Sequence, residues 1–264
     1  MSNVLLHRVL VIAPHPDDDV IGCGGLLQRA AESRVLFVTD GDRNPWPQRI
    51  LLRKLSIGDE DRRRWGAMRR RESLEALSLL GIPESQTRFL GFADQSLMSL
   101  ARRRDRRLLE ILVEEIRSFA PTLIVSSSTF DAHYDHRALA WYAHKAAEEC
   151  GVDIVTYSIH GSAPADRLRT ILELAEGERA RKRAAILCHQ SQLLLSRNRF
   201  LSYATDCEGF YRDEHDIVRF ESRLTSIALR AMHALFVLFG RHDALHVESA
   251  ADVHHGARDV PRLF

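Results

Sequence analysis

The chain has 264 residues, of which 45% are hydrophobic and 28% charged, a composition typical of a soluble globular protein with a sizeable core. Its formal net charge is +1, so no strong positive field indicates nucleic acid as a partner. The four cysteines form no CxxC pair, which favours a reduced, cytoplasmic protein over a secreted one. No signal peptide or transmembrane segment is expected, because the first apolar run is short and no run approaches the ~20 apolar residues of a membrane span.

The first predicted strand covers residues 8–13, a short apolar run rich in β-branched side chains that prolines terminate. One imidazole and three carboxylates follow it, in the run His15-Pro16-Asp17-Asp18-Asp19, and a helical pattern comes next. Adjacent carboxylates repel one another, and a bound cation offsets that cost. His and Asp together suit a divalent metal such as zinc. The alternative is a polar turn in which Asp17 or Asp18 caps the helix.

A second strand is predicted over residues 34–39, followed by a polar segment, residues 43–65, that contains two prolines. We expect this segment to be an irregular loop that leaves the sheet beside the first motif and covers the site, or else a solvated insertion. A helix follows and continues to about Leu80. The arginines of residues 62–64 and 69–71 are divided among several faces of that helix, which is typical of a solvated surface.

A second polar cluster follows another predicted strand, residues 122–125. Its sequence is Phe130-Asp131-Ala132-His133-Tyr134-Asp135-His136, and a helical pattern comes after it. Both clusters therefore occupy the end of a strand that leads into a helix, which is where ligands bind in open α/β sheets. If the two strands are neighbours in a parallel sheet, His15, Asp18 and His136 converge on one ion.

Further strands are predicted at residues 88–90 and 153–157, with an amphipathic helix over 108–119 between them. The resulting β-α alternation predicts a Rossmann-like α/β fold, a mostly parallel sheet with helices on both faces. Beyond it we expect a helix over residues 173–187 and a C-terminal helical or irregular addition. The apolar run at residues 227–239 predicts a buried helix, with an oligomer interface or a membrane-surface contact as alternatives.

Several motifs together resemble the PIG-L (LmbE-like) family of zinc-dependent N-deacetylases. In chain order they are His15-Pro16-Asp17-Asp18, Val38-Thr39-Asp40-Gly41, Arg69-x-x-Glu72, Phe89-Leu90-Gly91-Phe92-x-Asp94, His133-x-Asp135-His136, Lys182, His189-Gln190-Ser191-Gln192 and Glu208-Gly209-Phe210. The chain departs from the family pattern at Asp19, where the family usually has Glu, and at Tyr134, where it usually has Pro. The resemblance predicts a deacetylase domain over residues 1–210 and an extension, residues 211–264, that packs on the same domain.

The resemblance implies an enzyme that removes an N-acetyl or other N-acyl group from an amino-sugar conjugate, such as an N-acetylglucosamine derivative. It implies that His15, Asp18 and His136 hold Zn²⁺, or another divalent transition metal, which activates a water molecule and polarises the carbonyl. The substrate would be a small-molecule N-acetylated sugar conjugate. The resemblance is compatible with a homo-oligomer.

The resemblance also implies the roles of the remaining site residues. Asp17 would be the general base, and His133 would stabilise the oxyanion or protonate the leaving amine. Asp135 would orient and charge the His133 imidazole. Arg69 and Asp94 would bind the substrate: Arg69 matches a family arginine that contacts the substrate, and Asp94 matches a family aspartate that lies near the bound sugar.

Two other function classes compete with this interpretation. One is a metal-dependent hydrolase of an ester or phosphate bond, although a phosphatase more often shows ligands for two metals. The other is a non-catalytic sugar-binding protein, which would not need a water-activating base such as Asp17.

Overall fold

The computed structural model describes residues 7–161, 163–213 and 262–263. Its strands are β1 (Arg8–Ala13), β2 (Glu32–Thr39), β3 (Thr87–Phe92), β4 (Leu123–Ser127), β5 (Ile154–Tyr157), β6 (Leu168–Glu173), β7 (Cys207–Tyr211) and β8 (Arg262–Leu263). Its helices are α1 (Asp18–Arg29), α2 (Pro45–Leu52), α3 (Asp59–Leu79), α4 (Leu97–Arg102), α5 (Arg107–Phe119), α6 (Tyr134–Cys150), α7 (Glu176–Cys188) and α8 (Gln190–Ser202).

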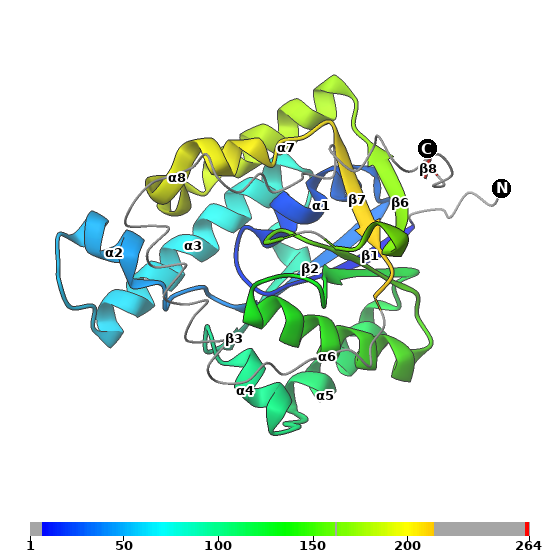
Figure 1. Ribbon diagram of the computed structural model, residues 1–264, viewed down its shortest axis with the longest axis horizontal. Coiled ribbons are helices and arrows are strands. Elements are labelled where there is room, and N and C mark those ends of the chain that lie inside the picture. Colours follow the sequence, from blue (N-terminus) through cyan, green and yellow to red (C-terminus); the bar gives the residue numbers. More distant parts are fainter. Residues whose placement is uncertain (1–6, 162, 214–261, 264) are drawn as a thin grey trace.

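The strands form one sheet in the order β3-β2-β1-β4-β5-β7-β6-β8 (Figure 1). Strands β1 to β5 are mutually parallel where they pair, β7 is antiparallel to β5 and β6, and β8 runs parallel to β6. The predicted Rossmann-like, mostly parallel α/β fold is therefore confirmed. Because β1 lies between β2 and β4, the two polar clusters predicted from the sequence follow adjacent strands.

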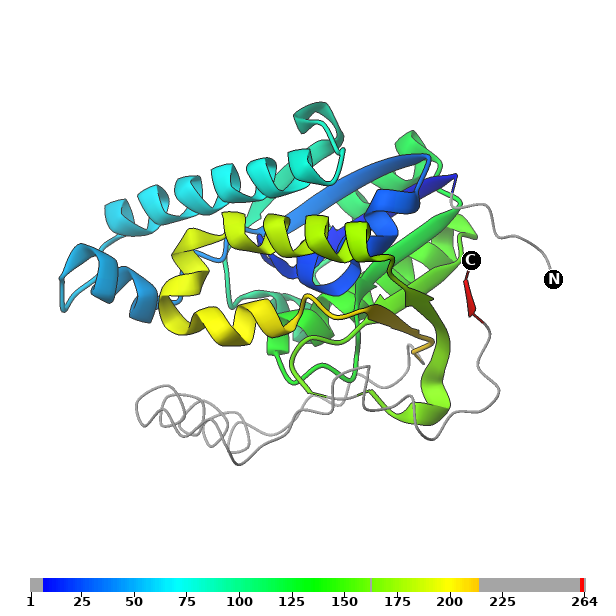
Figure 2. The same ribbon diagram turned by 90° about the horizontal axis from the view of Figure 1, so that it is seen from above.

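The central strands are apolar along their whole length because helices cover both faces of the sheet (Figure 2). Val9 and Val11 of β1 pack on the face covered by α1, α3 and α7, whereas Leu10 and Ile12 pack on the face covered by α4, α5 and α6. This alternation follows from the two-residue period of a strand. The sheet is thus a rigid platform whose carboxyl edge carries the loops described below.

The prediction that residues 43–65 form an irregular loop was wrong, because the segment contains α2 and the beginning of α3. Asn44 caps α2 by accepting a hydrogen bond from the backbone N–H of Trp46 (3.2 Å), and Pro45 stands in the first turn, where proline is compatible with a helix. The helix predicted over residues 173–187 is confirmed as α7, although it begins only at Glu176, because residues 168–173 form strand β6, which was not predicted.

The predicted domain boundary at residue 210 falls within β7, one residue before that strand ends. Most of the predicted extension, including the apolar run at residues 227–239, lies outside the described residues, so its organisation stays a prediction. Strand β8 joins the outer edge of the sheet next to β6. None of the described helices combines the length and apolar content that a bilayer crossing requires.

Candidate active site

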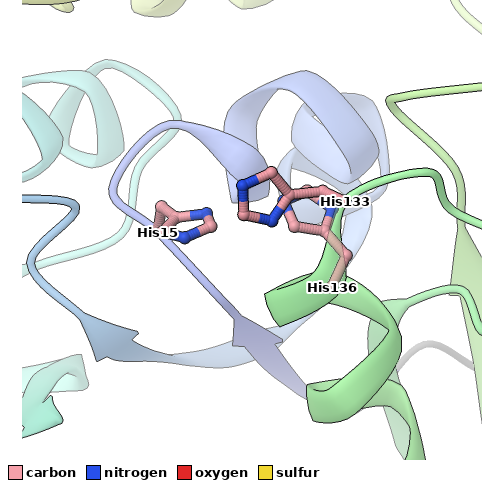
Figure 3. A group of neighbouring side chains, drawn as sticks. All are labelled: His15, His133 and His136. Carbon is pink, nitrogen blue, oxygen red and sulfur yellow. The ribbon is translucent and has the colours of Figure 1, made fainter. Parts of the chain in front are cut away.

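Two histidine-bearing segments meet at the carboxyl edge of the sheet. His15 lies in the turn from β1 to α1, and His133 and His136 lie at the start of α6, which follows β4. Figure 3 shows the three rings turned toward one another. The ring centroids are 4.9 Å apart for His15 and His133, 5.4 Å for His15 and His136, and 4.9 Å for His133 and His136. The topology therefore gathers in one place side chains that are more than a hundred residues apart.

The predicted metal ligands share a single carboxylate oxygen. Asp18 Oδ2 lies 3.0 Å from His15 Nδ1 and 3.2 Å from His136 Nε2. His136 Nε2 is buried, and this carboxylate oxygen lies within ion-pair distance of it. Burial alone would lower the pKa of His136, but the charges of Asp131 and Asp18 raise it to about 10. A cation bound between His136 Nε2 and the Asp18 carboxylate would take the place of the proton that the ring carries there.

Other groupings of ligand atoms overlap this set. Each of the following sets places its ligand atoms within 4.8 Å of one another: His15, His133 and His136; Asp18, His136 and His160; His15, Asp94 and Asp135. Buried imidazoles and carboxylates in such proximity form a donor set typical of divalent transition metals. The residues therefore fit a divalent metal, although the overlap among the groups leaves the ligand set itself a prediction.

Asp17 lies beside the predicted ligands in a strained backbone conformation, with φ at 131°. Such strain persists only where the surroundings enforce it, and it is common at functional sites. The side chain is buried and its Oδ1 lies 3.1 Å from Arg69 Nη2. Burial raises the pKa of Asp17 to about 7 even though Arg69 lowers it. A carboxyl group with this pKa exchanges protons near neutral pH, as a general base must.

Arg69, which was predicted to bind substrate, lies beneath the first motif and is buried. Its Nη1 donates to the carbonyl of Gly41 (2.8 Å) and its Nη2 to the carbonyl of Pro16 (2.5 Å). Together with the ion pair to Asp17, these bonds fix the strained turn. A contact between Arg69 and substrate stays a prediction, whereas its support of Asp17 is visible in the structure.

The carboxylate of Asp135 differs in its partners from the prediction. Its oxygens accept from the backbone N–H groups of Gln95 (2.6 Å) and Leu97 (3.2 Å), and Oδ2 lies 3.6 Å from His15 Nε2. It therefore faces His15, while only its backbone N–H contacts His133, by donating to Nδ1 (3.3 Å). The reason is that the first turn of α6 points this side chain toward the beginning of α4.

Asp94 was predicted to contact substrate and lies at the same sheet edge, after β3. Its Oδ1 lies 3.2 Å from His15 Nε2, and its Oδ2 accepts from the backbone N–H of Arg43 (2.9 Å). The carboxylate is buried, which by itself would raise the pKa of Asp94. The contact with His15 outweighs this effect and holds that pKa well below its usual range. Asp94 thus stays charged beside His15, and its contact with substrate stays a prediction.

Asp131, for which no role was predicted, is fully buried and orients the second motif. Its Oδ2 lies 3.1 Å from His136 Nδ1 and accepts from the backbone N–H groups of Ile159 (2.9 Å) and His160 (3.1 Å). Its Oδ1 accepts from the backbone N–H of His133 (2.8 Å). A carboxylate behind a metal-binding histidine fixes the ring and its tautomer. The residue stood within the predicted motif, but only the position of β5 reveals its partners.

Two further histidines that received no role lie at or near the site. His160 follows β5, with its ring centroid 5.0 Å from that of His136. His189 ends α7 and is buried, and within the described part of the chain its two ring nitrogens find no hydrogen-bond partner. Burial and the charge of Arg69 lower the pKa of His189 to about 3, so the ring is neutral. The motif around His189 was noted in the sequence, whereas nothing distinguished His160.

The later motifs around Lys182 and Glu208 support α1 from behind the site. Helix α1 is broken at Cys23, where φ is −148°, and Glu208 accepts from the freed backbone N–H groups of Gly25 (2.7 Å) and Leu26 (3.0 Å). The Lys182 ammonium donates to the same carboxylate (2.6 Å), and both side chains are 1% exposed. This buried pair therefore holds the helix that begins at the Asp17–Asp18 turn.

Comparison with known proteins agrees with this arrangement. The model of the PIG-L family, described as GlcNAc-PI de-N-acetylase, matches residues 10–147, which include both histidine motifs. No curated protein matches the chain in a sequence search.

Several solved structures share the fold. N,N'-diacetylchitobiose deacetylase from Pyrococcus horikoshii is 21% identical with a TM-score of 0.53, covering 83% of this chain and 88% of its own. The zinc-inhibited form of teicoplanin deacetylase Orf2 is 21% identical with a TM-score of 0.59, covering 74% of this chain and 90% of its own. The 4-carboxy-2-hydroxymuconate hydratase GalB from Pseudomonas putida is 20% identical with a TM-score of 0.56, covering 91% of this chain and 92% of its own.

Proposed function

Because this chain belongs to the PIG-L family, we propose that it is a metal-dependent hydrolase that removes an N-acetyl or related N-acyl group from an amino-sugar conjugate. The observation that carries the proposal is the Asp18 carboxylate, one oxygen of which lies within 3.2 Å of nitrogens of both His15 and His136. The fold alone does not select the reaction, since a hydratase shares it. The family and the constellation of side chains select it together.

His15, Asp18 and His136 would hold the metal, and two imidazoles with one carboxylate favour zinc. A bound ion of this kind supplies a Lewis acid that polarises the acyl carbonyl and makes water more acidic. Asp131 keeps the His136 ring in place by accepting from Nδ1, which leaves Nε2 for the metal.

Asp17 would accept the proton of the attacking water. Its carboxylate is adjacent to Asp18 but is held apart by the strained turn and by Arg69. Transfer of that proton to the departing nitrogen would complete the release of the amine and the acid.

His133 would donate a hydrogen bond to the oxyanion that develops on the carbonyl. Burial, together with the neighbouring charge of His136, lowers the pKa of His133 well below its usual value, so the ring is neutral. Its Nδ1 accepts from the backbone N–H of Asp135, which places the proton on Nε2. A neutral imidazole of this tautomer is a donor at Nε2, and a donor aimed at a developing negative charge lowers the barrier.

Two variants test this division of roles. Asp17→Ala should retain bound zinc and lose about 10²–10⁴-fold in the rate of acetate release, the usual effect of removing a general base. His136→Ala should lose both the metal and the activity. The exposed His7→Ala variant is the control and should lose neither. If Asp17→Ala lost zinc and activity in parallel, Asp17 would be a ligand and the assignment would be wrong.

The substrate is proposed only at the level of chemical class. The family name and the deacetylase neighbours support an N-acetylated amino sugar joined to a second group. The metal is proposed to be zinc on the ligand chemistry, and metal analysis of the purified protein tests this directly.

A further inference from the structure

Arg199 lies beside the site and does not take part in the mechanism described above. Helix α8 is broken at Ser196, where φ is −164° and ψ is 90°. After the break, Arg199 Nη2 lies 3.1 Å from His160 Nδ1. The His160 ring centroid is in turn 5.0 Å from that of His136 and 5.7 Å from that of His133. A single imidazole therefore separates the guanidinium from the proposed catalytic centre.

Among the described residues, no carboxylate pairs with the half-buried Arg199, in contrast to two other half-buried arginines. Arg29 pairs with Glu178 at 2.7 Å and Arg70 with Asp40 at 2.7 Å. Within the described residues, the contact found for Arg199 is a ring nitrogen of His160 instead. A partly desolvated charge is costly unless a counter-charge is present. The arrangement suits a site in which the counter-charge arrives with the ligand.

The neighbouring imidazole is compatible with this interpretation. The guanidinium has only N–H donors, so in this contact it is the donor and His160 Nδ1 is the acceptor. One Arg199 nitrogen is engaged in this bond. A guanidinium has five N–H donors in a planar fork, which matches the geometry of phosphate and carboxylate groups.

We propose that Arg199 is a specificity-determining residue that binds an anionic group, a phosphate or a carboxylate, on the part of the substrate joined to the amino sugar. This inference rests on the proposed function, which it makes more specific. The substrate would thus be an acidic conjugate of an N-acylated amino sugar, bound with its amide at the proposed metal and its anion at the broken end of α8.

The test compares three substrates: N-acetylglucosamine 1-phosphate, the carboxymethyl glycoside of N-acetylglucosamine, and the neutral methyl glycoside. The wild-type enzyme should prefer one or both anionic substrates, and the preferred one identifies the anion. In Arg199→Gln, kcat/KM for that substrate should fall about 10–100-fold, the usual effect of losing a charge-assisted hydrogen bond, mainly through KM. The neutral substrate should change less than about twofold. Arg197→Gln, an exposed position on the same helix, is the matched control and should change neither.

Two results would overturn the inference. One is a wild-type enzyme that hydrolyses the neutral glycoside as efficiently as both anionic substrates. The other is an equal loss of kcat on all substrates in Arg199→Gln, which would show that Arg199 only positions His160.

A binding experiment separates failure of this inference from failure of the proposed function. If the zinc-loaded enzyme released no acetate from any substrate, the proposed function would fail. Calorimetric titration with glucose 1-phosphate and with glucose would then show whether Arg199 binds an anionic group. Binding of the phosphate alone, weakened at least tenfold in Arg199→Gln and unchanged in Arg197→Gln, would support the anion site, and any other pattern would refute it.

Discussion

Replacing Asp131 by Asn tests whether the Asp131 carboxylate holds the His136 ring in position for the metal. The native carboxylate contacts four nitrogens: Oδ2 faces His136 Nδ1 and the backbone N–H groups of Ile159 and His160, and Oδ1 faces the backbone N–H of His133. An asparagine has the same shape but presents an NH₂ group at one of these two positions. An NH₂ group at the position of Oδ2 would face three nitrogens that need an acceptor. We therefore expect the NH₂ group at the position of Oδ1, where it faces only the backbone N–H of His133.

The magnitude follows from that count. One partly buried backbone donor, the N–H of His133, would lose its acceptor, which costs about 1 kcal/mol of stability. The negative charge behind His136 would also disappear, and substitutions of this kind typically reduce metal affinity about 10–100-fold. Because the charge of Asp131 raises the pKa of His136, its loss also makes the ring a weaker base for a cation.

The assay is zinc affinity measured by competition with a chromophoric chelator, together with urea unfolding of the metal-free protein. Glu115→Gln is the control, because Glu115 on α5 is a buried carboxylate away from the site, where it pairs with Arg34 of β2 and Arg88 of β3. It should lower stability and leave zinc affinity unchanged. If Asp131→Asn bound zinc as tightly as the wild type, the proposed support of His136 would be refuted.

Three further predictions address the surroundings of the site. Arg69→Lys should retain zinc but lower kcat about tenfold, because one ammonium cannot reproduce the planar bonds that hold the Asp17 turn; an unchanged kcat would contradict this role. Lys182→Met should cost about 3–5 kcal/mol in urea unfolding, since it leaves the buried Glu208 charge without its cation, and adding Glu208→Gln should recover part of that loss. Asp213→Asn should lower the free energy of unfolding at pH 7. Although burial opposes it, a neighbouring imidazole and backbone N–H hold the pKa of Asp213 below its ordinary value, so its contribution is present above about pH 4 and is lost as the pH falls through the folded-state pKa. A difference from the wild type that did not shrink in acid would refute the assignment.

Much of the fold and the centre of the site could be predicted from local sequence. The strand and helix alternation was readable because buried parallel strands are short and apolar, and the polar motifs followed their ends. His15 and His136 were expected to meet because adjacent parallel strands place their carboxyl ends at one edge, and β1 does pair with β4.

The remaining features depend on tertiary contacts or on local exceptions. Helix α2 was missed because the prolines near its start were interpreted as loop signals, although the first turn of a helix accommodates them. The partners of Asp131 depend on β5 pairing next to β4, which no local pattern encodes. Arg199 reaches His160 only because α8 breaks at Ser196, where the sequence carries no glycine or proline.

The central claim is that this protein is a metal-dependent amide hydrolase of amino-sugar conjugates. The most direct measurement is amine release from a panel of N-acetylglucosamine conjugates by the purified protein, before chelation, after chelation and after zinc is returned. We predict release that chelation abolishes and zinc restores. The absence of release from every conjugate, with stoichiometric zinc bound, would contradict the claim and point to hydrolysis or hydration of a different bond.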